Sequence, residues 1–422
     1  MPSAAPRHIR LVNIGYPPFV GGAQTYVQLL AESLLAGGDQ PSVYTTNAGE
    51  VEAIWNAGKR LLPAGLQDVN GVPVRRVPLS HLPPAPYGYY ALRRLTVALA
   101  QMPGVPLGLL RALAGFTPWV PGMDGALATD SGPVDLVHGF TIPFESLLLA
   151  GLRFARARGV PFVVTPFLHT GEGTDPSVER GYAMPHQIAL LQAADAVVTL
   201  TDIERDFLLW HGVRPERVHA IPAGIPVEPG AFDGPVGPPA APPFVLFLGA
   251  VTYDKGAVHL VQAVTRLHAA GAAVRLVIAG TVTDQFWRAT GLSPAAPDQA
   301  VTVLGNVPEA RKQELLRDCV ALAMPSRVDS FGLVFLEAWA AGRPVIGARA
   351  GGIPAVVDHE QNGLLVRFGD MDGLAAAIKR LVQRRDEATA MGLAGRAKLL
   401  RCYTWDTVFG QLSAVYDRVL RR

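Results

Sequence analysis

The sequence predicts an α/β protein built from two doubly wound domains that face each other across a cleft. Three observations lead to this prediction. The chain has 422 residues, which is too long for one typical hydrophobic core. Short β-branched runs alternate with longer Ala- and Leu-rich helical patterns, as is typical of parallel α/β architecture. The alternation is interrupted once, by a stretch rich in Pro and Gly, and then starts again.

The first domain is predicted over residues 1–226. Helical periodicity over residues 23–38 ends at a Gly-Gly pair, which predicts a helix after the first strand. Six strands are expected, at residues 9–15, 41–46, 134–139, 161–166, 196–201 and 218–224. Residues 227–243 have no periodicity and many Pro and Gly residues, so we expect them to link the two domains.

The second domain is predicted over residues 244–403, where the alternation resumes. Its expected strands are residues 244–250, 274–280, 301–307, 321–326, 344–349 and 363–368, and its expected helices are residues 257–271, 311–319, 331–342 and 371–385. Doubly wound sheets bind ligands at the carboxyl ends of their strands, so a site is expected there. The sequence of residues 404–422 predicts a last helix that could pack back on the first domain.

Composition and charge exclude several classes of protein. Charged residues make up 17% of the chain and apolar residues 49%, which argues against disorder. The net charge of +2, without any run of Lys or Arg, argues against a nucleic-acid partner. Two cysteines make neither a disulfide framework nor a metal signature, which is typical of a reducing cytoplasm.

Residues 95–116 are the most apolar part of the chain. Pro103, Pro106 and Arg111 interrupt this stretch, and a continuous span of about 20 residues is needed to cross a bilayer. We therefore expect buried helices here, with contact at a membrane surface as the open alternative. A cytoplasmic protein, either free or at the inner face of the membrane, is the corresponding expectation.

The stretch DSFGLVFLE contains the most informative chemistry. A buried strand is expected to end near Met324, and a helix is expected to begin at Phe331 or Gly332. The free N–H groups of the first turn of a helix bind anions, so the backbone over Gly332–Val334 is predicted to hold a phosphate. Asp329 lies just before this turn, beside the expected phosphate, and Glu337 lies further along the helix. The structural alternative is that Asp329 caps the helix and that Glu337 is a solvated helix residue.

Two further loops fit an anionic ligand. Lys255 and Gly256 follow a strand and precede a helix, where a cation and a permissive backbone suit a diphosphate. Lysine occurs only five times in the chain, which weakens the alternative of a surface lysine in a turn. Gly21 and Gly22 occupy the corresponding place in the first domain. The sequence has neither G-x-G-x-x-G after a strand nor G-x₄-G-K-[ST], so a dinucleotide fingerprint and a P-loop are excluded.

These residues resemble the retaining GT-B glycosyltransferases of family 4, the glycosyl transferases of group 1. The similarity runs from PPFVGGAQTYV (17–27) to YTWD (403–406), and its most specific part is MPSRVDSFGLVFLEAWAAGRPVIGARAGGIPAVV (324–357). The resemblance implies a two-domain enzyme that takes a hexose-type sugar from a nucleoside-diphosphate sugar, with UDP favoured over GDP. It implies front-face transfer that needs no metal or cofactor. The hydroxyl acceptor stays open between a lipid-linked molecule, a glycan and a small aglycone.

The resemblance also implies roles for individual residues. Glu337 would bind the ribose hydroxyls, Lys255 would neutralise the diphosphate, and Asp329 would lie against the donor sugar. The expected donor-binding residues are Gly21, Gly22, Lys255, Arg327, Ser330, Phe331, Gly332, Leu333, Val334 and Glu337. The expected catalytic residues are Asp329 and His138, with a buried structural histidine as the alternative for His138.

The sequence departs from the family pattern at several positions. Asp329 is one methylene shorter than the usual Glu, and Ala250 replaces an Arg that serves as a second diphosphate cation. Arg327 is our candidate to compensate. Ala355 replaces a frequent Glu, and Phe140 takes the place of the second histidine of a His-x-His-like element. His169, in TPFLHT, is a further candidate for the site.

Two alternatives to a transferase remain at this stage. A sugar-nucleotide epimerase has a similar fold, and a catalytically weak nucleotide-sugar-binding protein would fit the changes at Asp329, Ala250 and Ala355.

Asp370 and Asp372 form a D-x-D that could hold a metal, but their position predicts a helix N-terminus. The apolar and aromatic residues 84–120 are the candidate acceptor surface.

Overall fold

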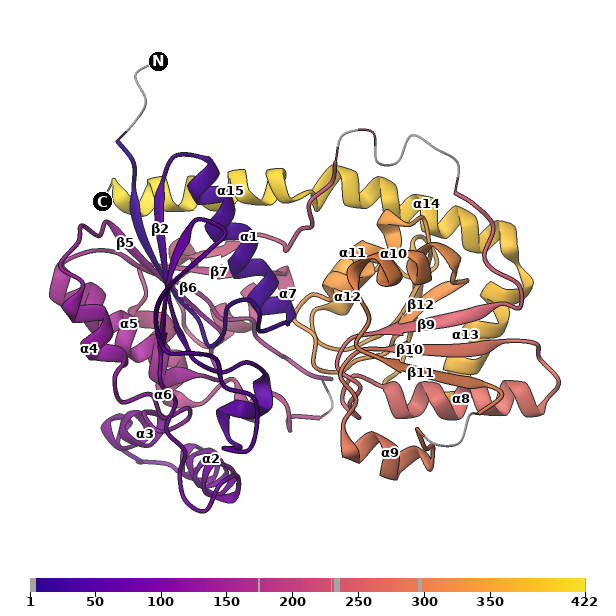
Figure 1. The fold of residues 1–422 in the computed structure, drawn as a ribbon, viewed down its shortest axis with the longest axis horizontal. Helices are drawn as coiled ribbons and strands as arrows, with labels where there is room; N and C mark the ends of the chain where they lie inside the picture. Colours follow the sequence, from indigo (N-terminus) through magenta and orange to yellow (C-terminus); the bar gives the residue numbers. More distant parts are fainter. Residues whose placement is uncertain (1–4, 174, 229, 231–235, 295–297, 422) are drawn as a thin grey trace. The chain divides into compact units, whose positions relative to one another are not determined.

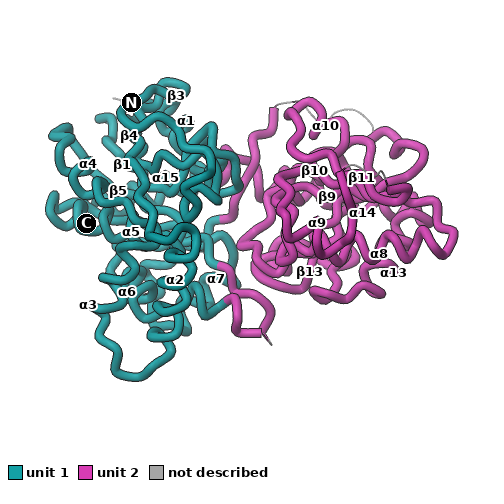
Figure 2. Tube along the Cα trace, turned by 60° about the horizontal axis from the view of Figure 1, so that its bottom comes forward, with its two compact units in different colours: residues 1–168, 179–221, 409–422 teal, residues 169–178, 222–408 magenta. Residues whose placement is uncertain are grey.

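The computed structural model describes residues 5–173, 175–228, 230, 236–294 and 298–421 (Figure 1). These residues form two compact units, shown in two colours in Figure 2. Unit 1 contains the described residues of 1–168, 179–221 and 409–422. Unit 2 contains those of 169–178 and 222–408. The predicted linker at residues 227–243 falls within unit 2, and its residues 229 and 231–235 lie outside the described part of the chain.

Unit 1 is built on a sheet of eight strands, counted over the described residues. The strand order is β3-β4-β2-β1-β5-β6-β7-β8, and every pair is parallel except β3 with β4. The strands are β1 (His8–Val12), β2 (Gln40–Thr46), β3 (Gly65–Val69), β4 (Val72–Val77), β5 (Leu136–Phe140), β6 (Phe162–Thr165), β7 (Ala196–Thr199) and β8 (Val218–Ala220). The six strands predicted for this half are present, and the edge pair β3–β4 was not predicted.

Seven α-helices and the end of an eighth accompany this sheet in the described residues. They are α1 (Gly22–Ala36), α2 (Tyr87–Ala100), α3 (Leu107–Ala114), α4 (Met123–Thr129), α5 (Glu145–Arg158), α6 (Pro185–Ala193), α7 (Asp202–Trp210) and, from Phe409 on, α15 (Trp405–Leu420). Three short 3₁₀ turns lie at Val51–Ile54, Glu179–Gly181 and Pro215–Arg217. The central strands are buried on both faces, which explains their continuous apolar sequences.

Unit 2 is built on a parallel sheet of six strands in its described residues, in the order β11-β10-β9-β12-β13-β14. The strands are β9 (Phe244–Leu248), β10 (Arg275–Ala279), β11 (Val301–Gly305), β12 (Ala321–Met324), β13 (Val345–Ala348) and β14 (Gly363–Val366). The helices are α8 (Ala257–Ala269), α9 (Asp284–Thr290), α10 (Glu309–Asp318), α11 (Leu333–Ala340), α12 (Ile353–Val356), α13 (Met371–Gln383) and α14 (Arg385–Cys402). Every strand and helix predicted for this half is present, whereas α9, α12 and α14 were not predicted.

The order of the second sheet determines where a ligand can bind in this unit. β9 lies between β10 and β12, so the sheet is extended first on one side of β9 and then on the other. The loops after β9 and β12 therefore leave the carboxyl edge at the point where strand order reverses. Doubly wound sheets bind ligands at such a point.

Residues 95–116 form the second half of α2, the connection after it, and α3. None of the helices in the described ranges is both long and apolar enough to span a bilayer. Most of residues 95–116 are exposed, so the expectation of buried helices in this stretch is wrong.

Candidate active site

The loops that follow β9 and β12 contact each other through their backbones. The backbone N–H of Arg327 donates to the carbonyl of Asp254 over 2.9 Å. Gly256 has φ of 80°, and a Cβ there would lie 2.3 Å from the carbonyl oxygen of Pro325. Only glycine fits this approach, because the backbone is left-handed and the space is already filled. The contact brings the predicted residues Lys255 and Asp329 to one place.

Lys255 and Asp329 form an ion pair. The distance from Nζ of Lys255 to Oδ1 of Asp329 is 2.7 Å, and the two side chains are 24% and 13% exposed. Burial opposes ionisation of Asp329, but the charge of Lys255 and its hydrogen bond hold the pKa of the Asp329 carboxyl below its usual value. Oδ2 of Asp329 is buried without a hydrogen-bond partner among the described residues. Asp329 is therefore an anion with one oxygen that has no hydrogen-bond partner in the described part of the chain.

The helix that follows begins as predicted. Gly332 is the N-cap of α11 with φ of 87°, and its carbonyl accepts from the N–H of Phe335 over 2.9 Å. A Cβ at Gly332 would lie 2.6 Å from the ring of Phe335, so a side chain here would need the ring to move. As in any α-helix, the first N–H groups have no acceptor within the helix. The N-terminus of α11 thus offers donors beside the ion pair of Lys255 and Asp329.

Glu337 lies one turn further along α11 and is not a solvated helix residue. Its Oε1 is 2.9 Å from Nζ of Lys312 on α10, and the two side chains are 23% and 24% exposed. Burial raises the pKa of Glu337, although Lys312 opposes this shift. Lys312 also contacts Glu309 at 2.9 Å. Sequence reasoning missed Lys312, and the scarcity of lysine was the one signal that could have pointed to it.

Arg327 is held between two carboxylates. Its Nε donates to Asp254 over 2.8 Å and its Nη1 donates to Asp175 over 3.0 Å. Its guanidinium carbon lies 5.0 Å from the centre of the Phe368 ring. Arg327 is at the predicted site, but the two carboxylates already balance its charge.

Residues 169–178 bring a histidine to the same edge of unit 2. The N–H of Gly351 donates to the carbonyl of Gly171 over 2.7 Å, and the N–H of Gly352 donates to that of Asp329 over 2.8 Å. Burial and the positive charge of Lys255 lower the pKa of His169 to about 4, while the negative charge of Asp329 opposes this shift. A neutral imidazole thus lies near the ion pair at neutral pH.

His138 lies in unit 1, within β5, and its side chain is fully buried. Nδ1 is 2.6 Å from the hydroxyl of Tyr416, and Nε2 is 2.8 Å from the hydroxyl of Thr165. The ring packs on Phe140 with 4.1 Å between centroids, and burial lowers the pKa of His138 to about 3. This environment favours the structural alternative, and a catalytic role for His138 stays a prediction.

The two glycines of the first loop also lie in unit 1. Gly21 is the N-cap of α1, and its carbonyl accepts from the N–H of Thr25 over 2.9 Å. Gly22 is the first residue of the helix. The predicted strand-loop-helix context is therefore present, while a role in donor binding remains a prediction.

The D-x-D at residues 370–372 has the predicted helical context. Asp370 is the N-cap of α13, where its carboxylate accepts from the N–H of Gly373 over 2.8 Å. Asp372 forms an ion pair with Arg266 at 3.0 Å. Over the residues that the structure describes, no group of three or more His, Cys, Asp or Glu side chains is arranged to hold a metal.

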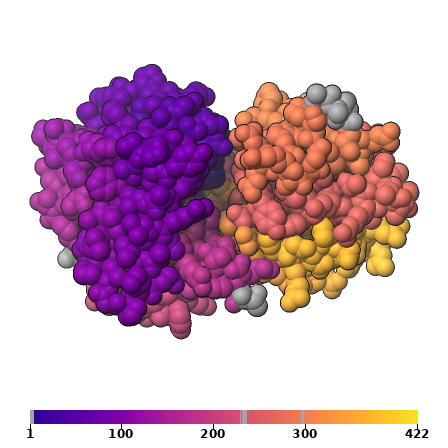
Figure 3. Space-filling model, turned by 90° about the horizontal axis from the view of Figure 1, so that it is seen from below, coloured from indigo at the N-terminus to yellow at the C-terminus, as the bar shows by residue number. Residues whose placement is uncertain are grey.

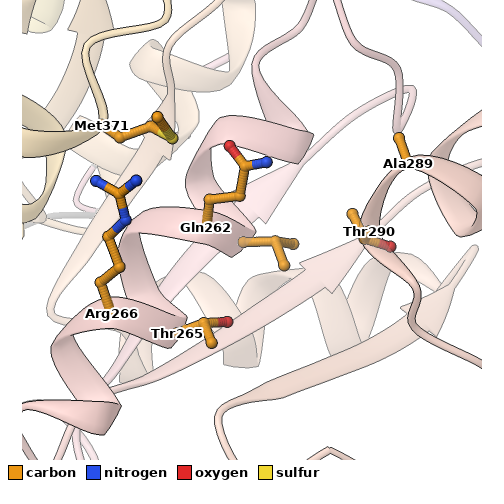
Figure 4. A pocket seen from close by; sticks show the side chains of 7 residues that line it. Gln262, Thr265, Arg266, Ala289, Thr290 and Met371 are labelled. Atoms are coloured by element: carbon orange, nitrogen blue, oxygen red, sulfur yellow. The ribbon is translucent and has the colours of Figure 1, made fainter.

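A hollow of about 360 Å³ lies elsewhere on unit 2 (Figure 4). It is lined by Val261, Gln262, Thr265, Arg266, Ala289, Thr290 and Met371. These residues come from α8, from the end of α9 and from the start of α13. None of the predicted site residues is among them, so we place the candidate site at the α11 N-terminus and not here.

Two family models match this chain. "Glycosyl transferases group 1" matches residues 232–398, and "Glycosyl transferase 4-like domain" matches residues 21–224. Alpha-maltose-1-phosphate synthase from Mycolicibacterium smegmatis is 30% identical over 300 residues, which are 64% of this chain and 76% of that protein. D-inositol 3-phosphate glycosyltransferase 1 from Catenulispora acidiphila is 29% identical over 443 residues, covering 98% and 96% of the two chains.

Solved structures with the same fold cover nearly the whole chain. Sucrose-phosphate synthase from Thermosynechococcus elongatus superposes with a TM-score of 0.68 at 21% identity, covering 98% of this chain and 99% of the other. Anabaena Alr3699/HepE in complex with UDP and glucose has a TM-score of 0.65 at 18% identity, covering 97% and 99%. At these identities the similarity concerns the fold.

Proposed function

Because the chain belongs to the glycosyl transferases of group 1, glycosyltransferases of the GT-B fold, we propose that it moves a hexose from a nucleoside-diphosphate sugar to a hydroxyl acceptor with retention of configuration. The observation that carries this proposal is the arrangement around α11. Two carboxylates, each paired with a lysine from another element, flank a helix N-terminus. An anion site between a sugar-side and a ribose-side carboxylate suits a nucleoside-diphosphate sugar.

In this proposal each group of the site has one task. The backbone over Phe331–Val334, with the half-buried Ser330 before it, receives the diphosphate, and Lys255 shares its charge between Asp329 and the phosphates. Glu337 accepts hydrogen bonds from the ribose hydroxyls. Asp329 faces the donor sugar, where an anion stabilises the positive charge that develops at the anomeric carbon.

The proposed transfer is a front-face displacement. The acceptor oxygen forms its bond to the anomeric carbon on the face from which the nucleoside diphosphate leaves. The bond between that carbon and the diphosphate oxygen breaks, and the departing diphosphate takes the acceptor proton. Lys255 and the α11 amides stabilise the charge of the leaving group, so we propose that no metal is required. Transfer rates that are unchanged by a chelator would support this.

UDP is the proposed nucleotide, since it is the commoner donor of the family and HepE was solved with UDP and with UDP-glucose. Starch synthase IV from Arabidopsis thaliana was solved with ADP and acarbose, so ADP belongs in the test. The family matches favour transfer over epimerisation. Since one relative is a D-inositol 3-phosphate glycosyltransferase, inositol 3-phosphate is one acceptor to try beside lipid-linked acceptors, glycans and small aglycones.

The location we propose is the cytoplasm, where thiols stay reduced. Cys319 is buried and Cys402 half-buried, and both are free thiols. Labelling of the thiols in intact cells, compared with lysed cells, tests this proposal.

The deciding experiment is thermal stabilisation by UDP, GDP, ADP and dTDP and by their glucose conjugates. A ligand at 100 times its dissociation constant adds about 2.7 kcal/mol of stability. We expect UDP and UDP-glucose to stabilise the protein and Glu337→Ala to abolish the effect. Glu309→Gln is the matched control, because Glu309 contacts the same Lys312 and is more exposed.

Three outcomes separate the candidates. Stabilisation that Glu337→Ala removes, together with transfer to an acceptor or donor hydrolysis, supports the transferase. Stabilisation without transfer or hydrolysis supports the weak nucleotide-sugar-binding protein instead. No stabilisation by any of the eight ligands, in protein that melts cooperatively, contradicts the proposed donor site.

A further inference from the structure

Helices α2 and α3 of unit 1 carry an exposed apolar surface, which we call the α2–α3 surface. The two helices pack on each other and lie side by side in Figures 1 and 2, and Figure 3 views the molecule from their side. Its exposed large side chains are Tyr87 (71%), Tyr90 (42%), Leu95 (50%), Met102 (57%), Leu107 (40%), Leu109 (45%) and Phe116 (41%). Seven of the sixteen large apolar side chains exposed in the described residues thus lie within thirty residues. Scattered apolar side chains need no explanation, but so many within two packed helices and their connection indicate an interaction site.

The spacing of these side chains follows the helix. Tyr87, Tyr90 and Leu95 recur at intervals that place them along one face of α2. The inward face contains Thr96, which is fully buried. An apolar stripe on the outward face is the reverse of what a surface helix of a globular protein usually shows.

The stripe is held outward by contacts on the other face. Arg93 donates to the buried Glu145 over 2.6 Å and to the carbonyl of Gly181 over 3.1 Å. Tyr89 packs against Trp55 with 5.7 Å between ring centroids. Because these contacts fix the rotation of α2, the apolar side chains cannot turn into the core without breaking a buried ion pair.

The charged side chains of this part of the sequence have one sign. No Asp or Glu occurs from residue 69 to residue 123. Arg94 and Arg111 are exposed on α2 and α3. Helices whose sequence interleaves apolar and aromatic side chains with arginines and has no acidic residue are typical of proteins that lie on anionic membranes. A second copy of this chain would bring two positive surfaces together, which disfavours self-association through this face.

We propose that the α2–α3 surface docks unit 1 on a bilayer that contains anionic phospholipids. Tyr87, Tyr90, Leu95 and Met102 enter the headgroup region, and Arg94 and Arg111 contact lipid phosphates. The surface lies on the bilayer and does not span it, in line with the lack of a spanning helix in the described chain. This docking needs no nucleotide, so it stands or falls apart from the proposed transfer reaction.

The test is co-sedimentation of the full chain with vesicles of phosphatidylcholine alone and of phosphatidylcholine with phosphatidylglycerol. We expect binding to the anionic vesicles that weakens as salt is added. Arg94→Gln and Arg111→Gln are each expected to lower the partition coefficient about fivefold. Leu95→Ser with Met102→Ser is expected to weaken binding further, because the apolar contact is lost.

Matched controls exist on α14 of unit 2. Leu393 and Leu400 are 44% and 45% exposed, and Arg401 is exposed as well. Leu393→Ser with Leu400→Ser, and Arg401→Gln, should leave vesicle binding unchanged. All the substituted side chains are exposed, and coincident melting curves will show that the variants fold.

Three results would overturn the proposal. They are equal binding to neutral and anionic vesicles, no binding to either, and loss of binding in the α14 controls to the same extent. A dimer in gel filtration that Leu95→Ser with Met102→Ser converts to a monomer, without any vesicle binding, would assign the surface to a second copy of the chain.

Discussion

At the scale of single residues, the shorter carboxylate at position 329 keeps its charge through an ion pair with a lysine. Asp329 has one methylene less than the Glu of the family pattern, yet Lys255 reaches it at 2.7 Å. The pair keeps the carboxyl ionised in spite of burial. The structure therefore retains a negative charge near the α11 N-terminus, and the substitution does not by itself argue for an inactive protein.

Asp329→Asn is expected to lower kcat by about 100-fold, which corresponds to about 2.7 kcal/mol of transition-state stabilisation. The physical reason is the loss of the anion that faces the developing charge. Initial rates at several donor concentrations give kcat and KM separately. Asp329→Glu is the control and should keep most of kcat, and a fully active Asp329→Asn enzyme would remove Asp329 from the reaction.

Lys312 is expected to act as a positioning residue for Glu337. It opposes the rise in the pKa of Glu337, so Lys312→Met should raise that pKa further and leave the carboxyl protonated up to a higher pH. We expect donor binding about tenfold weaker at neutral pH, with recovery as pH rises and with kcat little changed. Titration calorimetry from pH 6 to pH 9 measures this, and Lys379→Met, on the exposed face of α13, is the control.

His138 gives a prediction about pH and stability. Its pKa is about 3 in the folded protein and about 6.5 when unfolded, so the folded state binds fewer protons between these values. Stability is therefore fully present above pH 6.5 and is lost as pH falls toward 3. From pH 7 to pH 5 the loss from this residue is about 2 kcal/mol.

Urea unfolding at pH 7 and pH 5 tests the assignment of His138. His138→Gln should be destabilised at pH 7 and should show a smaller difference between the two pH values, and transfer by the folded variant should change only a few-fold. A variant with unchanged stability and abolished transfer would instead support the catalytic role.

At the scale of elements, a glycine with positive φ lies at each end of α8. Gly256 and Gly271 have φ of 80° and 81°, so both cost an L-residue the same backbone strain. A Cβ at Gly256 would lie 2.3 Å from a carbonyl oxygen, whereas a Cβ at Gly271 has no atom within 4 Å. Substitution of Gly271 therefore measures backbone strain alone, whereas substitution of Gly256 measures backbone strain together with the clash with a carbonyl oxygen.

Gly271→Ala is expected to cost about 1 kcal/mol of stability, and Gly256→Ala more than about 2 kcal/mol, since the loop after β12 must also move. Chemical denaturation measures both costs. Stabilisation by UDP should persist in Gly271→Ala and fall in Gly256→Ala, because only Gly256 joins the two loops of the site. Equal costs for the two substitutions would mean that the loops separate freely.

The sequence predicts local features of this fold well and long-range contacts poorly. The strands of unit 2 and the start of α11 depend on neighbouring residues, so periodicity and a helix-starting glycine predict them. The partners of Glu337 and Arg327 depend on how distant segments pack. Lys312 is 25 residues from Glu337, and Asp175 is 152 residues from Arg327. No local pattern contains those pairings, and the antiparallel edge β3–β4 and helix α14 lacked a clear repeat.

At the scale of the whole molecule, each unit is completed by residues distant in sequence. Residues 169–178 belong to unit 2 although β6 and β7 of unit 1 lie on either side of them. Residues 409–422 belong to unit 1, where Arg7 contacts Asp417 at 2.7 Å and the hydroxyl of Tyr416 reaches His138. Leu412 is fully buried in α15 and Val415 nearly so.

Removal of residues 409–422 is expected to unfold unit 1 and to leave unit 2 folded. The deletion takes away the buried Tyr416 and its hydrogen bond to His138, which leaves a cavity and an unpaired polar group. Scanning calorimetry should lose one transition and keep the other. Deletion of residues 421–422 is the control and should leave both, and a truncated protein with two intact transitions would contradict this account of α15.

The placement of residues 409–422 also sets the order in which the units mature on the ribosome. Synthesis runs from the N-terminus, and domains usually fold as they emerge. Here the ribosome makes all of unit 2 before it makes the turns of α15 that bring Tyr416 to His138. The unit whose synthesis begins first is therefore completed last.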